Sequence, residues 1–251
     1  MRKLIKLLRL LPNRTYRAAL RYRVAATIEH DGFLRSESFA TLIDAGANKG
    51  QFSLAARATH PEAEIVAFEP LDAPAAIFEQ VFANDRRIRL IRAALGEQSG
   101  MAEIHVSRRM DSSSLLPIGK LQEQIFPGTE EAAIENVRVV RLDEELAVSG
   151  LPKPILLKID VQGFELELLK GAKASLPHID GIYTELSFVP LYSGQPLAHE
   201  VIAWLAEHDF RLAAIYHVSY RANGAAVQAD VHFRRVSDPA LPPTPPASTT
   251  L

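Results

Sequence analysis

Residues 42–53, LIDAGANKGQFS, decide the fold, because a short apolar strand leads into a glycine-rich turn and then directly into a helix. Gly46 and Gly50 allow the backbone of this turn to approach a ligand, and they let the helix start close to the strand. In open α/β sheets, ligands bind beyond the carboxyl ends of the strands. The stretch therefore predicts a ligand-binding turn at the start of a doubly wound sheet.

Strand and helix patterns alternate through the rest of the chain. Strands are predicted over 41–44, 64–68, 87–94, 102–107, 136–142, 154–159 and 181–186, and helices over 51–59, 73–83, 164–176 and 197–207. A final hairpin over 210–218 and 225–234 turns at Asn223–Gly224 and adds an antiparallel edge. Such repeated strand–helix units indicate a mostly parallel sheet with helices on both faces. The polar stretch 108–135 is predicted to be an insertion over an active site.

Composition narrows the class of protein. The chain has 251 residues, of which 47% are hydrophobic, and its net charge is only -2, which excludes bulk disorder. No apolar run reaches the roughly 18 residues that a membrane span requires. With no cysteine, disulfides, thiolate metal sites and cysteine nucleophiles are excluded. These features are compatible with a cytoplasmic protein.

The two ends of the chain differ from its body. Residues 1–23 carry eight basic and no acidic residues, and leucines recur at helical spacing over residues 4–11. We divide the chain into a basic amphipathic helical extension (1–35), a ligand-binding domain (36–236) and a disordered proline-rich tail (237–251). The basic helix either packs on the core or makes peripheral contact with the inner membrane face. The acidic body argues against nucleic acid as a partner.

Two carboxylates at strand ends indicate the ligand. Asp44 precedes the first glycine, where it would repel a pyrophosphate but suits a cationic amino or sulfonium group. Glu69 ends the second strand, where a carboxylate can accept both hydroxyls of an adenosine ribose. Since the turn also lacks the G-x-G-x-x-G spacing of dinucleotide sites, the pair favours S-adenosylmethionine over NAD.

Four motifs in order, LIDAGANKGQFS, AFEP, AALGE and LKIDVQGFELELLKGA, resemble the FkbM family of S-adenosylmethionine-dependent methyltransferases over roughly residues 40–235. The resemblance implies a class I, Rossmann-like methyltransferase fold with about seven strands, the last antiparallel. It also implies O-methylation of a hydroxyl on a sugar, glycan or other natural product. Family cofactor positions correspond to Asp44, Gly46, Ala47, Asn48, Gly50 and Glu69, and the adjoining Gln51, Pro70 and Ala94 complete the expected cofactor site. Gln162 stands where the family often has an acid.

Methyl transfer to an alcohol requires a base and good alignment. Asp160, at the end of the strand over 154–159, is the first candidate base, with a positioning role as the alternative. Glu185 and His217, at later strand ends, are further catalytic candidates, and Ser113 and Ser114 are candidate substrate contacts. Asp160, Glu185 and His217 could together hold a divalent metal, but no ligand spacing requires one, so we predict none.

A second class of function is compatible with the same residues. The basic N-terminus and the loss of the acid at Gln162 fit a catalytically silent adenosyl-binding or membrane-associated scaffold protein. The sequence indicates neither the methyl acceptor nor the oligomeric state. The expected partner is a small-molecule or glycan acceptor.

Overall fold

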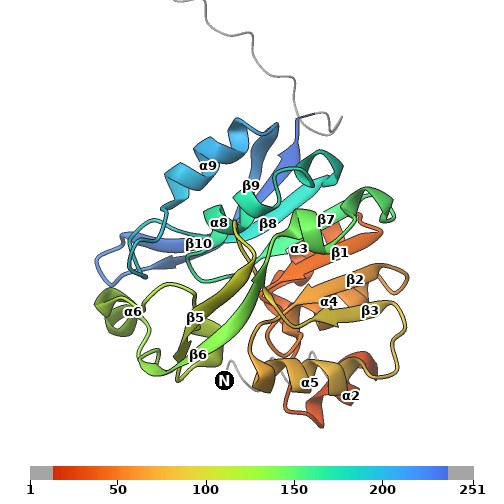
Figure 1. Ribbon diagram of the computed structural model, residues 1–251, viewed down its shortest axis with the longest axis horizontal. Coiled ribbons are helices and arrows are strands. Elements are labelled where there is room, and N and C mark those ends of the chain that lie inside the picture. Colours follow the sequence, from red (N-terminus) through yellow and green to blue (C-terminus); the bar gives the residue numbers. More distant parts are fainter. Residues whose placement is uncertain (1–13, 237–251) are drawn as a thin grey trace, which may run out of the picture.

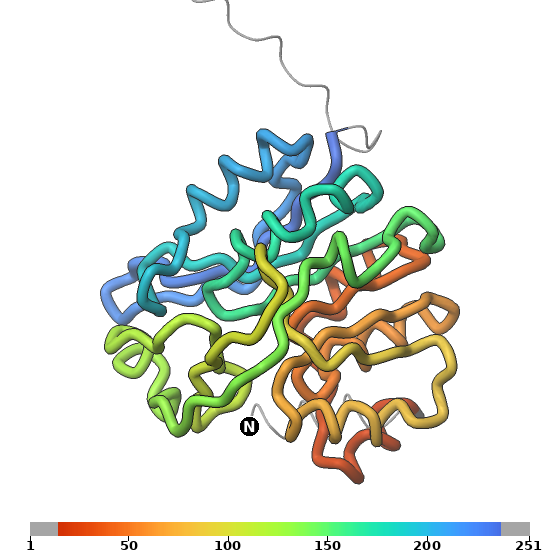
Figure 2. The backbone as a smooth tube through the Cα atoms, in the orientation of Figure 1, coloured from red at the N-terminus to blue at the C-terminus, as the bar shows by residue number. Residues whose placement is uncertain are grey.

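The computed structural model describes residues 14–236. Its main sheet has seven strands in the order β3-β2-β1-β7-β8-β10-β9 (Figure 1). The strands are β1 (Thr41–Ala45), β2 (Glu64–Phe68), β3 (Ile88–Ile91), β7 (Ile155–Ile159), β8 (Gly181–Ser187), β9 (Phe210–Tyr220) and β10 (Ala226–Arg235). β1 pairs in parallel with both β2 and β7, although β7 follows it by more than a hundred residues (Figure 2). This order is that of a class I methyltransferase fold, as the sequence predicted.

The last strand is antiparallel, as expected, but it does not form the edge. β10 lies between β8 and β9 and is antiparallel to both, so β9 is the edge strand. The prediction that the hairpin adds an antiparallel edge is therefore confirmed, with the first strand of the hairpin outermost. The second strand of the hairpin, β10, hydrogen-bonds to β8, and the first strand, β9, therefore lies outermost.

Helices cover both faces of the main sheet. The alternation of strand residues divides the core into two clusters: Ile43 and Val66 face one, whereas Leu42 and Ile65 face the other. α8 (Glu165–Gly171) and α9 (Ala198–Ala206) pack on the first, and α4 (Gln51–Thr59) and α5 (Asp72–Phe82) pack on the second. This two-sided arrangement is the doubly wound architecture that buried parallel strands require.

A second, three-stranded sheet stands apart from the first. It consists of β4 (Ala94–Leu95), β6 (Glu131–Val140) and β5 (Gly100–Ser107), in the order β4-β6-β5. The predicted strand over 87–94 is thus divided, because the chain leaves the main sheet after Ile91 and Ala94 pairs instead with Val139. The predicted insertion contains η2 (Met110–Ser112), α6 (Lys120–Ile125) and the start of β6.

Short helices complete the described chain: α2 (Arg14–Leu20), η1 (Ile28–His30), α3 (Asp31–Ser36), α7 (Leu142–Glu145), η3 (Val148–Gly150) and η4 (Leu176–His178). The predicted helix over 164–176 is broken, since α8 ends at Gly171 and η4 follows. Tyr16, Phe33 and Leu34 are buried in the cluster that α4 joins, so residues 14–36 pack on the main domain. The predicted amphipathic helix over residues 4–11 and the proline-rich tail lie outside the described residues.

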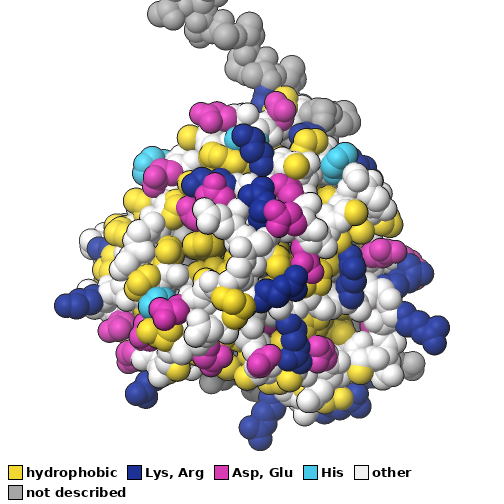
Figure 3. All heavy atoms as spheres, viewed as in Figure 1, with side chains coloured by type: hydrophobic (Ala, Val, Ile, Leu, Met, Phe, Trp, Pro, Cys, Tyr) yellow, Lys and Arg dark blue, Asp and Glu magenta, His cyan; other side chains and the backbone are white. Residues whose placement is uncertain are grey.

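The surface carries both signs of charge. Basic and acidic side chains lie next to one another across the face in Figure 3. Exposed ion pairs such as Arg92–Glu79, at 2.8 Å, are of this kind and contribute little to stability. Within residues 14–236, no helix is long and apolar enough to cross a membrane.

Candidate functional site

A pocket opens at the carboxyl ends of β1, β2 and β7, where the fold predicts ligand binding. Seven of the nine residues predicted to hold the cofactor line this pocket: Gly46, Ala47, Asn48, Gln51, Glu69, Pro70 and Ala94. Ser113, Ser114 and Asp160 line it as well, so the insertion does close over the site. Four other predicted site residues do not line the pocket but lie beneath, behind or beside it: Asp44, Gly50, Glu185 and His217.

The turn after β1 is tightly constrained. Gly46 has a φ of +75°, and a Cβ at this position would lie 1.9 Å from the carbonyl oxygen of Asp160. Asn48 adopts a φ of 48°, and its side-chain oxygen accepts a hydrogen bond from the Lys49 amide at 2.7 Å. Gly50 caps α4 with a φ of +87° and faces Phe82 rather than the pocket. The glycines thus shape the pocket floor through the backbone, and Gly50 acts from behind it.

Glu69 holds the turn from the end of β2. One carboxylate oxygen accepts from the Asn48 amide at 2.8 Å, and the other accepts from the Leu71 amide at 2.9 Å. Burial raises the pKa of Glu69 to about 7, against the opposing effect of these two hydrogen bonds and of Lys158. Each carboxylate oxygen has a further lone pair, so Glu69 can still accept hydrogen bonds from ligand hydroxyls.

Asp44 lies beneath the turn and not in the pocket wall. It is fully buried, accepts a hydrogen bond from the Ser53 hydroxyl at 2.6 Å, and lies 3.1 Å from the ammonium of Lys158. The prediction that Asp44 faces a cationic ligand was therefore wrong, because an internal cation already occupies that role. Burial acts to lower the pKa of Lys158, but the charges of Asp44, Asp160 and Glu69 outweigh it and raise the pKa.

Lys158 links this buried pair to the pocket. Its ammonium donates to the carbonyl oxygen of Gly46 at 2.9 Å and lies 3.7 Å from the Asp160 carboxylate. No role for Lys158 was predicted from the sequence. Its position two residues before Asp160, on the same face of β7, is the signal that could have identified it.

Asp160 is the most exposed carboxylate of the pocket floor, with 41% of its side chain accessible. Its Oδ1 accepts a hydrogen bond from the Gln162 amide at 2.7 Å. The Gln162 side-chain oxygen lies in turn 2.7 Å from the Tyr192 hydroxyl. Since both Lys158 and Gln162 stabilise a negative charge on Asp160, the arrangement suits the binding of a cationic group better than proton abstraction.

Glu185, at the end of β8, lies behind Gln162. Its two oxygens accept from the side-chain amides of Gln162 at 3.3 Å and Gln228 at 2.5 Å. Burial raises the pKa of Glu185 well above its ordinary value, and the charges of Asp160 and Asp230 add to the increase. Because it does not line the pocket, Glu185 does not meet a bound acceptor in this geometry.

His217 belongs to a separate group at the border of the pocket. Its Nδ1 lies 2.9 Å from the Asp230 carboxylate, and its ring centre is 5.2 Å from that of His30. His30 lines the pocket from η1. Neither His30 nor Asp230 was singled out from the sequence, because His30 is far from His217 along the chain and Asp230 meets His217 through the irregular pairing of β9 with β10. The three predicted catalytic residues therefore do not converge on one point.

Comparisons with known proteins agree with this architecture. A family model described as methyltransferase FkbM domain matches residues 44–212. The 2-O-methyltransferase NoeI of Sinorhizobium fredii (strain NBRC 101917 / NGR234) is 28% identical over 160 residues, which cover 61% of this chain and 66% of that protein. The 31-O-demethyl-FK506 methyltransferase FkbM of Streptomyces tacrolimicus is 28% identical over 200 residues, covering 69% and 73%.

Solved structures also match this chain, and the matches to curated relatives cover only part of each relative. The crystal structure of a precorrin-6y C5,15-methyltransferase from Geobacter metallireducens GS-15 aligns with a TM-score of 0.45 at 11% identity, covering 84% of this chain and 92% of that chain. The chain spans 66%, 59% and 57% of the lengths of the first three curated relatives it matches. The family model covers more than half of the chain, from Asp44 at the binding turn to β9, and the chain therefore belongs to the methyltransferase FkbM domain family.

Proposed function

We propose that the protein is an S-adenosylmethionine-dependent O-methyltransferase, and that its acceptor is a hydroxyl on a sugar, a glycan or another natural product. Membership of the FkbM domain family supports methyl transfer. Two relatives, a 2-O-methyltransferase and a 31-O-demethyl-FK506 methyltransferase, support oxygen as the methylated atom. The observation that carries the proposal is the position of Glu69 and Asp160 in one pocket with the glycine turn.

The donor groups of the pocket fit S-adenosylmethionine. Glu69 keeps free lone pairs at the end of β2, where a ribose would bind, and the Gly46–Asn48 turn supplies close backbone. Asp160, half-exposed on the same floor, fits the amino group of the methionine portion. When bound, S-adenosylmethionine supplies a methyl group on a positively charged sulfur, which is an electrophile for an acceptor hydroxyl.

The residues of the chain then have distinct tasks. Glu69 orients the ribose, and Asp160, fixed by Gln162 and Lys158, orients the methionine portion. Ser113 and Ser114, on the segment that covers the pocket, and His30 from η1 also line the pocket, and we assign them to the acceptor side. Such alignment of two bound reactants accounts for much of the rate enhancement in a displacement at carbon.

Calorimetry with S-adenosylhomocysteine tests the cofactor assignment. We expect Glu69→Ala to weaken binding at least tenfold, since it removes the ribose acceptor and the support of the turn. Glu123→Ala, an exposed change on α6, is the matched control and should bind as the wild type does. Unchanged affinity in Glu69→Ala would contradict the proposal.

Methyl transfer itself is tested with labelled S-adenosylmethionine and a panel of mono- and oligosaccharides. Each acceptor is paired with its counterpart in which the hydroxyls are already O-methylated. We expect a mass increase of one methyl group only on acceptors with free hydroxyls. Tight cofactor binding without transfer to any hydroxyl acceptor would favour a non-catalytic adenosyl-binding protein instead.

A further inference from the structure

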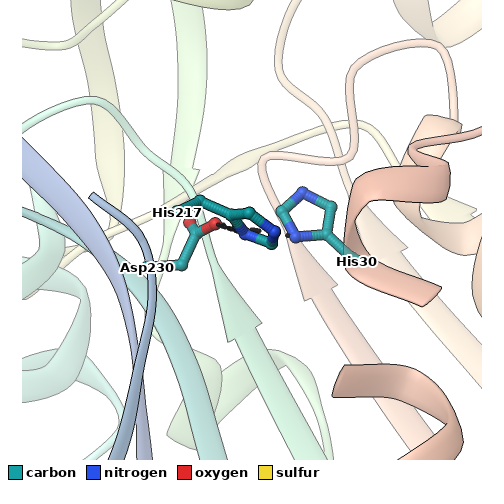
Figure 4. A group of neighbouring side chains, drawn as sticks. All are labelled: His30, His217 and Asp230. Atoms are coloured by element: carbon teal, nitrogen blue, oxygen red, sulfur yellow. Dashed lines mark hydrogen bonds and ion pairs between the residues drawn. The ribbon is translucent and has the colours of Figure 1, made fainter. Parts of the chain in front are cut away.

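Two imidazoles and one carboxylate from three elements converge beside the pocket: His30 of η1, and His217 and Asp230 of the hairpin strands β9 and β10 (Figure 4). Both imidazoles present Nδ1 to the same oxygen of Asp230, at 2.9 Å for His217 and 3.6 Å for His30. One potential ligand atom from each residue lies within 4.8 Å of the other two. This grouping is independent of the residues that bind the cofactor.

Two of the three spacings, those to Asp230, are close to the spacing of metal ligands, and the third is within 4.8 Å. Two ligands at 2.0–2.1 Å from a tetrahedral zinc ion lie about 3.3 Å apart, and the two distances to Asp230 lie on either side of this value. Two nitrogen donors with one carboxylate oxygen suit zinc and similar transition metals, whereas magnesium prefers a shell of oxygen atoms.

The backbone is shaped to bring His217 to this group. The pairing of β9 with β10 shifts between Ser219–Gln228 and Tyr216–Asp230, so two residues of β9 oppose one of β10. This is the pattern of a β-bulge, and His217 lies within it at a φ of 46°. A regular strand would not place residue 217 in this conformation, so the bulge is what sets the direction of its side chain.

The surroundings support orientation of the ligands and leave access from the pocket. Phe52 lies against the His30 ring at 5.4 Å between centres and restricts its position. The Tyr183 hydroxyl lies 3.0 Å from the same Nδ1 of His30 that faces Asp230, so a bound metal would replace this contact. His217 has 41% of its side chain exposed, whereas His30 and Asp230 are mostly buried. Because His30 also lines the pocket, a metal held by three protein ligands would keep a coordination position toward it.

We propose that His30, His217 and Asp230 form a binding site for a divalent transition metal of the zinc type, with an open coordination position facing the acceptor side of the pocket. The site stands on its own geometry. Its use, which rests on the proposed function, is to bind the acceptor hydroxyl oxygen and lower its pKa, so that the proton passes to solvent water. The resulting oxyanion forms the bond to the methyl carbon as the bond between that carbon and the sulfonium sulfur breaks, which leaves S-adenosylhomocysteine. Such loss of the proton would supply the activation for which no convergent base was found among Asp160, Glu185 and His217.

Metal binding is tested directly on the full chain, expressed without added histidines and stripped with a chelator. Titration with Zn²⁺ against a competing indicator should show one equivalent bound per chain. We expect His217→Ala and Asp230→Asn each to weaken Zn²⁺ binding at least tenfold. His199→Ala, an exposed histidine on α9, should leave it unchanged, and excess Mg²⁺ should not displace the Zn²⁺.

A second measurement separates loss of the site from loss of the fold. S-adenosylhomocysteine binding by His217→Ala and Asp230→Asn should equal that of the wild type, and Zn²⁺ should raise the melting temperature of the wild type but of neither variant. Absence of stoichiometric Zn²⁺ binding, or equal binding in all variants, overturns the metal site while leaving the methyltransferase proposal intact. Zn²⁺ binding by a chain that does not bind S-adenosylhomocysteine would support the metal site and contradict the methyltransferase proposal.

Discussion

The ammonium of Lys158 lies 3.1 Å from the carboxylate of Asp44, and both side chains are buried beneath the turn that forms the pocket floor. The same ammonium donates to the Gly46 carbonyl and lies near Asp160. The buried ammonium of Lys158 thus links β1 and β7, two of the parallel strands that carry the site. The sequence indicated that Asp44 would face a cationic ligand, but Lys158 neutralises its charge within the protein.

Asp44→Asn should therefore destabilise the fold strongly. The change preserves an oxygen for Ser53 but leaves Lys158 without its closest counter-charge, and breaking a buried ion pair costs about 3–5 kcal/mol. Urea denaturation measures the loss. The double variant Asp44→Asn/Lys158→Met should recover part of it, since the unpaired charge is removed. A single variant as stable as the wild type would show that the pair contributes nothing.

Binding of S-adenosylhomocysteine should weaken as the pH falls through about 7. Burial raises the pKa of Glu69 to about 7, and ribose hydroxyls donate to its ionised form, so binding favours loss of the Glu69 proton. Below that pKa, affinity should decrease by up to about tenfold for each pH unit. Calorimetry at pH 6, 7 and 8 measures the slope. Glu69→Gln, which has no proton to lose, is the control and should show a flatter profile, and an equal slope in both would reject the assignment.

Tyr192→Phe should lower both the affinity for the cofactor and the rate of methyl transfer. The Tyr192 hydroxyl lies 2.7 Å from the Gln162 side-chain oxygen and 3.0 Å from the Ser112 carbonyl, so it fixes the amide that holds Asp160. Its loss removes the single O–H donor that these two acceptors share, and leaving a buried acceptor unsatisfied costs about 1–3 kcal/mol. Calorimetry should show weaker S-adenosylhomocysteine binding, because that ligand keeps the amino group assigned to Asp160, and steady-state kinetics should show a reduced kcat. Tyr220→Phe, an exposed change on β9, should alter neither value.

The parallel sheet and the pocket floor were predictable from local patterns. Continuous apolar strands such as 155–159 and the glycine turn after Asp44 are short-range signals, and the family resemblance covers them in order. Seven of nine predicted cofactor residues line the pocket because strand ends lie together in any sheet of this type. The first two parallel strands therefore fix most of the cofactor site.

The missed residues depend on contacts that no local pattern records. Lys158 neutralises Asp44 across neighbouring strands, which becomes apparent only once β1 and β7 are known to pair. His217 reaches Asp230 through a bulge, and a one-residue shift in strand register changes the face on which a side chain lies. His30 joins them from a helix that precedes the sheet. The alternation of residues in the sequence therefore predicted that His217 lies at a strand end, but it did not identify His30 and Asp230 as its neighbours.

A pair of glycines tests how closely the small sheet packs on the main domain. A Cβ at Gly171, the last residue of α8, would lie 1.9 Å from the carbonyl oxygen of Gly96, and neither backbone can move without displacing its element. Overpacking of this kind costs typically about 1–3 kcal/mol, so Gly171→Ala should lower the free energy of unfolding by at least that much. Gly32→Ala, in α3, is the matched change, because nothing lies within 4 Å of its Cβ and the position is exposed. Alanine favours a helix there, so Gly32→Ala should raise stability by up to about 1 kcal/mol. Urea denaturation of both variants decides the point: if the two behave alike, the contact between α8 and the loop after β4 is looser than the structure has it.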